Sequence, residues 1–458
     1  MILKRLKKIV FKFGIDGAIG YTVLARIISV TGGLLTIVFI ALFLSEEEQG
    51  YYYTFGSIIA IQVFFELGLN GIITQYVAHE TAHLQWSSKI ELSGNEQHLS
   101  RLSSLLRFCI KVYGILALVL FIVLEISGYV FFTRYHQGIE NVSWQFPWAL
   151  IALTTSLIFI VSLLLSFIEG LGKVKEVAKI RVIQAIINIS IIGLVFAFKG
   201  GLYALGIASL ASFFILSGSI LFSNQKHLLL FIYHAKSKWK VDYWKEIFPY
   251  QYKIALSWIS GYFLFQLFNP VLFAIEGPKV AGQMGMTLSA LNGISSLSMS
   301  WISTKVPLYS TLIANKTYEK LDYIFNKTFK QLSTVNLLLI MGFITFIHLL
   351  NIFELPLANR FLDAIPLILL CLVTTVNLFV FAWATYLRCH KKEPFLVYSV
   401  VMGLSCAIST LLLGKHFGLM GIIVGYSTLS IIFGFPWAYY IFRTKKREWH
   451  GNSKINYY

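Results

Sequence analysis

Charged side chains within apolar stretches are the residues of this sequence most able to do chemistry. Arg26 lies about nine residues into the first apolar stretch, and Glu66 and Glu125 lie within the second and third. Ionised groups are costly in hydrocarbon, so such residues are candidates for binding a substrate, an ion or one another. An arginine stays charged and holds a phosphate through two hydrogen bonds. A buried carboxylate with a raised pKa can bind H⁺ or Na⁺.

Two interpretations are open for each of these residues. At 1.5 Å per residue, Arg26 lies roughly 13 Å deep, which predicts contact with an anionic substrate or an ion pair with Glu66. Glu66 lies roughly 20 Å from the inner end of its stretch. Beside Leu67-Gly68-Leu69, it is expected to pair or to pack, and the alternative is an ion-coupling carboxylate. Glu125 lies towards the outer end of its stretch, where a solvated rim residue is favoured over a coupling one.

Cations at the ends of apolar stretches form a second candidate group. A positive vestibule would concentrate an anionic head group, and it would consist of Arg181, Lys253, Lys305 and Arg388. The alternative is that these residues only follow the general enrichment of positive charge on the cytoplasmic side.

Two sites in the sequence predict bends in the helices. Pro removes a backbone donor, so Asn269-Pro270 should break its helix, which suits a hinge or a gate. Gly32-Gly33 is the corresponding flexible point in the first half of the chain.

The composition identifies the elements that must position these groups. Of 458 residues, 57% are hydrophobic and 13% charged, and the mean hydropathy is +0.72. A soluble protein carries about 25% charge. Because lipid cannot satisfy backbone polar groups, each long apolar run must be a helix unless the chain closes into a barrel. A barrel would show short alternating segments, which are absent from the sequence, so the chain is predicted to be an all-α integral membrane protein.

Twelve spans are predicted, at about 18–44, 51–79, 108–132, 146–168, 180–198, 202–222, 254–275, 282–304, 331–350, 364–387, 395–413 and 418–441. Placing both termini in the cytoplasm puts 31 of the 38 Lys and Arg residues in inner segments, five in outer segments and two within spans. This asymmetry follows the positive-inside rule. The first residues, 1–13, are either a basic helix lying in the inner interface or ordinary flanking charge.

The chain is predicted to consist of two parallel six-helix halves around a central cavity. A basic turn ends at Glu176 and a Gly-marked turn follows 25 residues later at Gly201, and the same spacing separates Glu393 from Gly418. Gly50 and Gly282 also correspond. Such repeats are typical of alternating-access transporters. The predicted division is 1–222 for the first half, 223–253 for a basic cytoplasmic linker, and 254–458 for the second half with its basic tail.

Three short stretches resemble a known family. Residues 44–55 read LSEEEQGYYYTF, residues 65–69 read FELGL and residues 76–80 read YVAHE. Together with the twelve-span plan, they resemble the polysaccharide transporters (Wzx-type O-antigen and capsule flippases) of the MOP exporter superfamily.

This resemblance implies a flippase that moves undecaprenyl-diphosphate-linked oligosaccharides across the bacterial plasma (inner) membrane. It implies no single invariant motif, so residue roles rest on the physical arguments above. Anionic membrane lipids, and the polymerase or ligase of the same polysaccharide pathway, are the expected partners.

Other classes of function fit the sequence less well. The net charge is +17, but the basic residues lie between apolar blocks, so a nucleic-acid partner is not expected. No metal-ligand, nucleophile or P-loop pattern is present, so we expect a transporter and not an enzyme, with no cofactor besides H⁺ or Na⁺ as a coupling ion. The main alternative is an H⁺- or Na⁺-coupled multidrug or metabolite exporter of the same superfamily. That class predicts acidic residues deep in the spans, of which only Glu66 and Glu125 qualify. The sugar, the oligomeric state and the pathway do not follow from the sequence.

Overall fold

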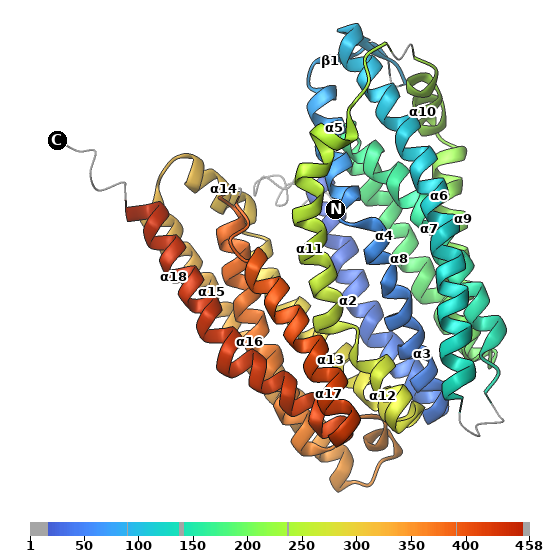
Figure 1. Cartoon of the computed structure of the whole chain (residues 1–458), viewed down its shortest axis with the longest axis vertical. Coiled ribbons are helices and arrows are strands. Elements are labelled where there is room, and N and C mark those ends of the chain that lie inside the picture. Colours follow the sequence, from blue (N-terminus) through green and yellow to red (C-terminus); the bar gives the residue numbers. More distant parts are fainter. Residues whose placement is uncertain (1–16, 89, 137–141, 236–237, 391, 452–458) are drawn as a thin grey trace, which may run out of the picture. The chain divides into compact units, whose positions relative to one another are not determined.

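The computed structural model describes residues 17–88, 90–136, 142–235, 238–390 and 392–451 (Figure 1). This part of the chain is mostly α-helical. Its strands are β1 (Leu84–Trp86) and β2 (Leu92–Gly94), which pair antiparallel as a small hairpin. The predicted basic helix at residues 1–13 lies outside the described residues.

Nine helical stretches of the described chain are long and apolar enough to cross a membrane. They are Glu46–Thr81, Glu96–Tyr135, Gln145–Gly170, Val174–Ala197, Tyr203–Leu221, Gln251–Glu276, Tyr318–Ile352, Ala364–Arg388 and Leu396–His450. The last stretch contains two helices, because its backbone leaves the helical conformation at Gly418 (φ 56°). With α2 (Gly17–Phe43) and α13 (Pro278–Ser303) the total reaches about twelve, which confirms the predicted all-α, multi-pass membrane fold.

The chain divides into two compact units. The described part of unit 1 comprises residues 17–44 and 58–258, and unit 2 comprises residues 45–57 and those from 259 onward. The chain therefore passes between units inside α3 (Glu46–Ile59) and inside α11 (Phe248–Phe265). The division predicted from the sequence, with boundaries near 222 and 253, stays a prediction.

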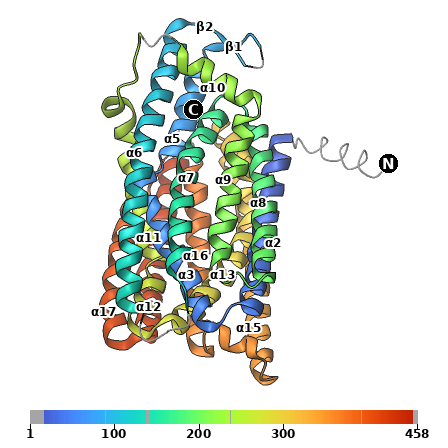
Figure 2. The same cartoon turned by 90° about the vertical axis from the view of Figure 1, so that its right-hand side faces the viewer.

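Unit 1 is built around α7 (Gln145–Gly170), the span with the largest buried share. It packs against α5 (Leu69–Thr81), α6 (Glu96–Tyr135) and α9 (Tyr203–Leu221), and α2 packs on α8 (Val174–Ala197) (Figure 2). A Cβ at Gly128 of α6 would lie 2.0 Å from the Trp148 ring, so a glycine lets this large side chain lie between the helices. The remaining elements of unit 1 are η1 (Ala60–Gln62), α4 (Val63–Glu66), α10 (Asn224–His234) and η2 (Tyr243–Ile247).

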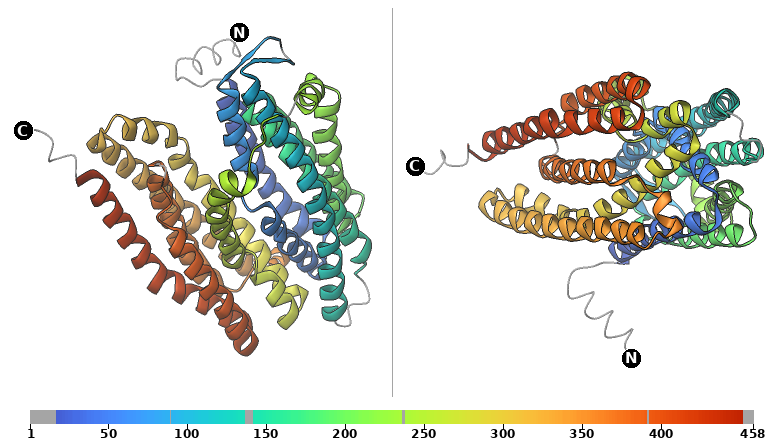
Figure 3. Two further views of the ribbon diagram at one scale, coloured as in Figure 1. Left: turned by 45° about the horizontal axis from the view of Figure 1, so that its top comes forward. Right: turned by 90° about the horizontal axis from the view of Figure 1, so that it is seen from below.

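Unit 2 is built around α13, which packs against α12 (Phe268–Glu276), α15 (Tyr318–Ile352) and α16 (Ala364–Arg388). Helices α15, α16 and α18 (Phe435–Gly451) run side by side (Figure 3), and aromatic residues such as Phe325, Tyr386 and Phe442 fill the space between them. Its other elements are α14 (Val306–Ala314), η3 (Pro356–Arg360), α17 (Leu396–Thr428) and η4 (Leu429–Gly434).

The glycines of the predicted repeat occupy special positions. Gly201 and Gly418 both have a positive φ, of 50° and 56°, a conformation that glycine adopts without a steric penalty. Gly50 and Gly282 pack against each other, because a Cβ added to Gly282 would lie 2.9 Å from the Gly50 nitrogen. Contact between the corresponding glycines is what a pseudo-twofold relation between the two helices would produce.

Candidate functional site

A polar network surrounds Glu66 inside unit 1. Asn70 Nδ2 donates to Glu66 Oε1 at 2.9 Å and lies 3.3 Å from Ser162 Oγ of α7. The Tyr113 hydroxyl of α6 donates to Asn70 Oδ1 at 3.3 Å. Polar groups buried in a membrane protein satisfy one another in this way, because lipid offers them no partners. The network joins four helices, α4 to α7, and leaves the half-buried Glu66 carboxylate with one amide partner among the described residues.

The helix carrying Glu66 is broken directly after it. Leu67 and Gly68 both take up the left-handed conformation, with φ of 48° and 70°. A leucine in this region is strained, so the surrounding packing must hold it there. Gly68 also has no room for a side chain, since a Cβ would lie 2.4 Å from Ile254 of α11. The break places Asn70 at the start of α5, within reach of the carboxylate.

The break predicted at Asn269-Pro270 is present in unit 2. Helix α11 ends at Phe265 and α12 begins at Phe268, just before the proline. Asn269 Nδ2 donates to Ser57 Oγ of α3 at 3.3 Å. The Asn269 Oδ1 atom and the nearby Thr54 hydroxyl are both buried and make no hydrogen bond in the described part of the chain. Whether the break acts as a hinge stays a prediction.

The second predicted flexible point takes a different form. Helix α2 continues through Gly32 and Gly33 without interruption. A Cβ on Gly32 would lie 2.1 Å from Ile189, so this glycine permits close contact between α2 and α8. The bending role predicted for the pair has no counterpart in the backbone.

The four cations of the predicted vestibule divide into two groups. Two are already paired: Arg181 with Glu169 at 3.1 Å, and Arg388 with Glu393 at 2.7 Å. The other two are exposed: Lys253 lies over the Tyr252 ring, and Lys305 precedes α14. In both paired arginines, part of the guanidinium is already occupied by a carboxylate.

The remaining predicted residues are placed as follows. Arg26 lies on α2, within the apolar stretch, and its side chain lies outside the described part of the structure. Glu125 of α6 has a buried Oε1 atom with no hydrogen-bond partner among the described residues.

A buried ionic cluster in unit 1 was not predicted from the sequence. Glu80 of α5, with a side chain 4% exposed, accepts from Arg101 Nε at 2.8 Å and lies 2.6 Å from His98 Nδ1. Arg101 also reaches Glu246 at 2.5 Å. Burial disfavours the charged form of Glu246, but hydrogen bonds from Arg101 and the Asp242 backbone outweigh it and lower the pKa of this carboxyl.

A comparable cluster in unit 2 holds the end of α18. Asp322 of α15 accepts from Lys446 at 3.0 Å and from the Tyr386 hydroxyl, and it lies 3.8 Å from His450. His450 lies 3.2 Å from His390, and burial beside this second imidazole lowers the pKa of His390.

Both clusters follow the same plan. The start of the third span is joined through charged groups to the segment after the sixth span in unit 1, and to the end of the last helix, α18, in unit 2. Arg101 and Glu246 lie 145 residues apart, and Asp322 and Lys446 also lie more than a hundred residues apart, so no local pattern pairs them. The one available signal was the presence of a charged residue near the start of an otherwise apolar helix.

The described residues form two compact helical units with broken membrane helices and buried polar networks, and this fold can be compared with those of known proteins. Profiles of protein families give no match to this sequence, and curated proteins give none either. Solved structures do match over nearly the whole chain.

Three of the similar structures are transporters or flippases. An inward-facing multidrug resistance MATE family transporter of the MOP superfamily shares 14% identity, covers 95% of this chain and 100% of its own, and gives a TM-score of 0.64. The lipid II flippase MurJ, in an inward closed conformation, shares 16% identity over 95% of this chain and 90% of its own, with a TM-score of 0.57. The MATE multidrug transporter DinF-BH shares 14% sequence identity, covers 95% of this chain and 96% of its own, and gives a TM-score of 0.55. At these identities the similarity establishes the fold: the chain has the fold of MOP superfamily transporters.

Proposed function

We propose that this protein is a flippase that moves undecaprenyl-diphosphate-linked oligosaccharides across the bacterial plasma membrane by alternating access. Such a substrate needs a cation for its diphosphate, polar groups for its sugars and two units that can move against each other. The chain passes between the units within α3 and α11, and backbone breaks follow both passages, at Leu67-Gly68 and before Asn269. These breaks give the connecting helices points at which they can bend.

The observation that carries the proposal is the charge in the interior of the spans. Arg26 lies within the apolar stretch of α2, whereas the acids away from the ends of the described spans are Glu66 and Glu125. A guanidinium in this setting favours a phosphate. A cavity for cationic drugs would need more acidic residues than these two provide.

The comparisons with solved structures fit both a flippase and a multidrug transporter. One similar fold is described as a lipid II flippase, and others are described as multidrug transporters. The resemblance of residues 44–55, 65–69 and 76–80 to polysaccharide transporters favours the flippase.

Glu66 is our candidate for coupling to H⁺ or Na⁺. It is half-buried, and the amide of Asn70 holds it close to the break in its helix. An ion bound to the Glu66 carboxylate would replace its hydrogen bond from Asn70. This change would in turn affect the backbone conformation at Leu67-Gly68. Polysaccharide polymerases or ligases are the partners we propose for such a flippase.

The test is deletion of the gene with plasmid rescue, followed by quantification of undecaprenyl-diphosphate-linked oligosaccharide that faces the cytoplasm. We expect accumulation in the deletion strain, clearance by wild type, and failure of Arg26→Ala at equal expression. Lys111→Ala, which removes an exposed cation of α6, is the matched control and should rescue. If Arg26→Ala rescues as well as the control, Arg26 is not the working cation.

A coupled drug exporter is the second candidate, favoured by the Glu66 network and by the MATE-like fold. It predicts that the deletion strain accumulates no lipid-linked oligosaccharide and becomes sensitive to cationic dyes. That pair of results would reject the flippase.

A further inference from the structure

Part of the segment between the two halves lies folded along α6. We call residues 233–235 and 238–246 the strap. Ser100 Oγ donates to the Trp239 carbonyl at 3.2 Å and accepts from the Trp239 N–H at 2.9 Å. Ser103 Oγ donates to the Ala235 carbonyl at 3.1 Å, and Arg107 donates to the Tyr233 carbonyl at 2.6 Å. One face of α6 therefore holds the strap through its main chain.

The end of the strap at Glu246 is also held by side chains of unit 1. Arg101 binds the Glu246 carboxylate at 2.5 Å, and the Tyr76 hydroxyl donates to the Glu246 carbonyl at 2.5 Å. Asp242 caps the following turn by accepting from the Trp244 N–H at 3.1 Å. The backbone and the acidic side chains of the strap are thus occupied.

The strap also carries several strongly exposed side chains. Trp239 is 43% exposed and Trp244 70% exposed, and the Lys245 side chain is 85% exposed. Lys238 and Lys240 are exposed as well. Aromatic residues this exposed are unusual on a water-facing surface and typical of the belt where a membrane meets water.

The position of the strap along the helices agrees with that level. It contacts α6 between Ser100 and Arg107, just before the apolar stretch of that helix, and it ends where α11 begins. Tryptophans lie among the headgroups at such helix ends. Lysines near a surface of anionic lipid strengthen binding by about fivefold each.

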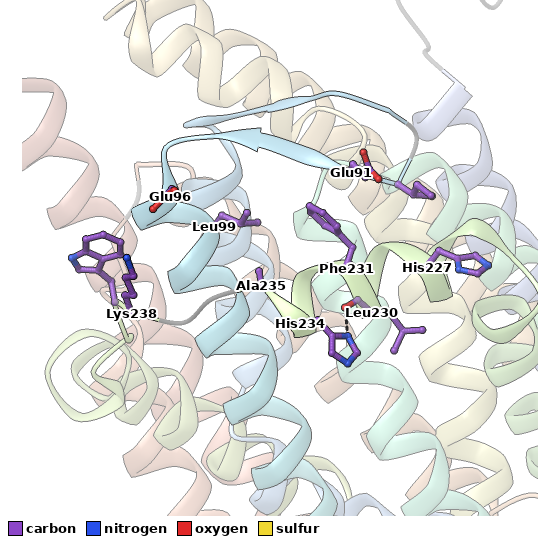
Figure 4. Close-up of a pocket in the computed structure, with 11 residues that line it drawn as sticks. Glu91, Glu96, Leu99, His227, Leu230, Phe231, His234, Ala235 and Lys238 are labelled. Carbon is purple, nitrogen blue, oxygen red and sulfur yellow. Dashed lines mark hydrogen bonds between the residues drawn. The ribbon is translucent and has the colours of Figure 1, made fainter.

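A cavity of about 870 Å³ adjoins the strap between α10, the start of α6 and the hairpin (Figure 4). Glu91 and Glu96 line it together with Lys238 and Trp239. His227 and His234 share this lining with the two carboxylates, so its charge is mixed, whereas the exposed side chains of the strap include three lysines.

We propose that the outward face of the strap, formed by Lys238, Trp239, Lys240, Trp244 and Lys245, is a docking surface for the headgroups of anionic phospholipids. The occupant follows from the charge of the surface and from its level at the ends of the spans. The proposal is independent of the transported substrate.

The test uses the full chain in nanodiscs that contain dibrominated phosphatidylglycerol or dibrominated phosphatidylcholine, whose bromines quench nearby tryptophan. The difference between wild type and Trp239→Phe/Trp244→Phe isolates the signal of the strap from the other tryptophans. We expect the strap signal to be quenched at several-fold lower fractions of brominated phosphatidylglycerol than of phosphatidylcholine. Lys238→Gln/Lys240→Gln/Lys245→Gln should remove this preference, so that the two lipids quench the strap signal at similar fractions.

The matched control is Lys175→Gln/Lys179→Gln/Lys316→Gln, which removes the same charge from other exposed positions at predicted cytoplasmic ends. It should keep the preference. Equal quenching by the two lipids, quenching by neither, or an equal loss in the control would each overturn the proposal. A final arm adds undecaprenyl diphosphate to phosphatidylcholine nanodiscs containing brominated phosphatidylglycerol. Displacement of phosphatidylglycerol at stoichiometric amounts would assign the surface to the diphosphate of a lipid-linked substrate and overturn the phospholipid assignment.

Discussion

The geometry of the ionic cluster in unit 1 predicts how much stability the protein loses when Arg101 is replaced. In Arg101→Gln, the Glu80 carboxylate keeps only His98 as a partner in a site where its side chain is 4% exposed. Removing one partner from a buried ion pair costs about 3–5 kcal/mol. Arg101 also contacts Glu246, whose side chain is 31% exposed, so water partly screens this second ion pair. We therefore expect a loss near the lower end, about 3 kcal/mol, or roughly 6–12 °C in apparent melting temperature for a unit of this size.

A thiol-reactive dye can measure this change, because Cys109 of α6 is fully buried until unit 1 unfolds. The assay uses a background in which Cys109 is the remaining cysteine, so that the signal reports unit 1. Lys111→Gln is the control, since that lysine is exposed on the same helix, and it should melt within about 2 °C of the parent, a change of the size expected for surface substitutions.

A double variant distinguishes ion pairing from general damage to the packing. Glu80→Gln/Arg101→Gln replaces the charged pair with neutral amides and should recover part of the stability lost in Arg101→Gln, because no uncompensated charge stays buried. If the double variant melts below the parent by the sum of the losses of Arg101→Gln and Glu80→Gln, the two side chains do not interact and the reasoning is wrong.

Three further predictions concern other sites. Gly50→Ala should destabilise unit 2 by about 1–3 kcal/mol, because the new Cβ would lie 2.0 Å from a backbone oxygen, whereas Gly56→Ala, with nothing within 4 Å, should melt at or above the parent temperature. Under the proposed function, Glu66→Gln should abolish the dependence of transport in proteoliposomes on a proton or sodium gradient while the protein still folds; unchanged dependence would exclude this residue as the coupling group. The pKa of His390 is lowered by burial beside His450, so the stability it contributes is present above the ordinary histidine value of about 6.5 and is lost as the pH falls through the folded value; melting curves of unit 2 between pH 7.5 and 5 should show this loss, and His390→Gln should flatten it.

Much of the fold could be predicted because its signals are local. Apolar runs and the distribution of lysine and arginine predicted about twelve spans, and Pro270 predicted the break that the structure places three to four residues earlier. The corresponding prediction for Gly32-Gly33 had no such basis, since glycine tolerates a bend but does not require one. At Gly32 the close approach of Ile189 explains the residue without a bend.

The parts that could not be predicted depend on distant contacts. Leu67 adopts a left-handed conformation that is unfavourable for leucine, and no sequence pattern predicts it. Arg101 meets Glu246 only because the strap folds back along α6. The pairing of Arg181 with Glu169 and of Arg388 with Glu393 is local by contrast, and it depends on how the turns beside these arginines fold.

The way in which the strap is held also bears on how this protein can change. Ser100, Ser103 and Arg107 contact main-chain atoms of the strap, which every amino acid provides except for the N–H group that proline lacks. The outward residues of the strap can therefore be exchanged with little effect on its attachment, whereas the three residues of α6 cannot. An engineer could rewrite the strap for a different membrane composition, and natural selection has the same freedom.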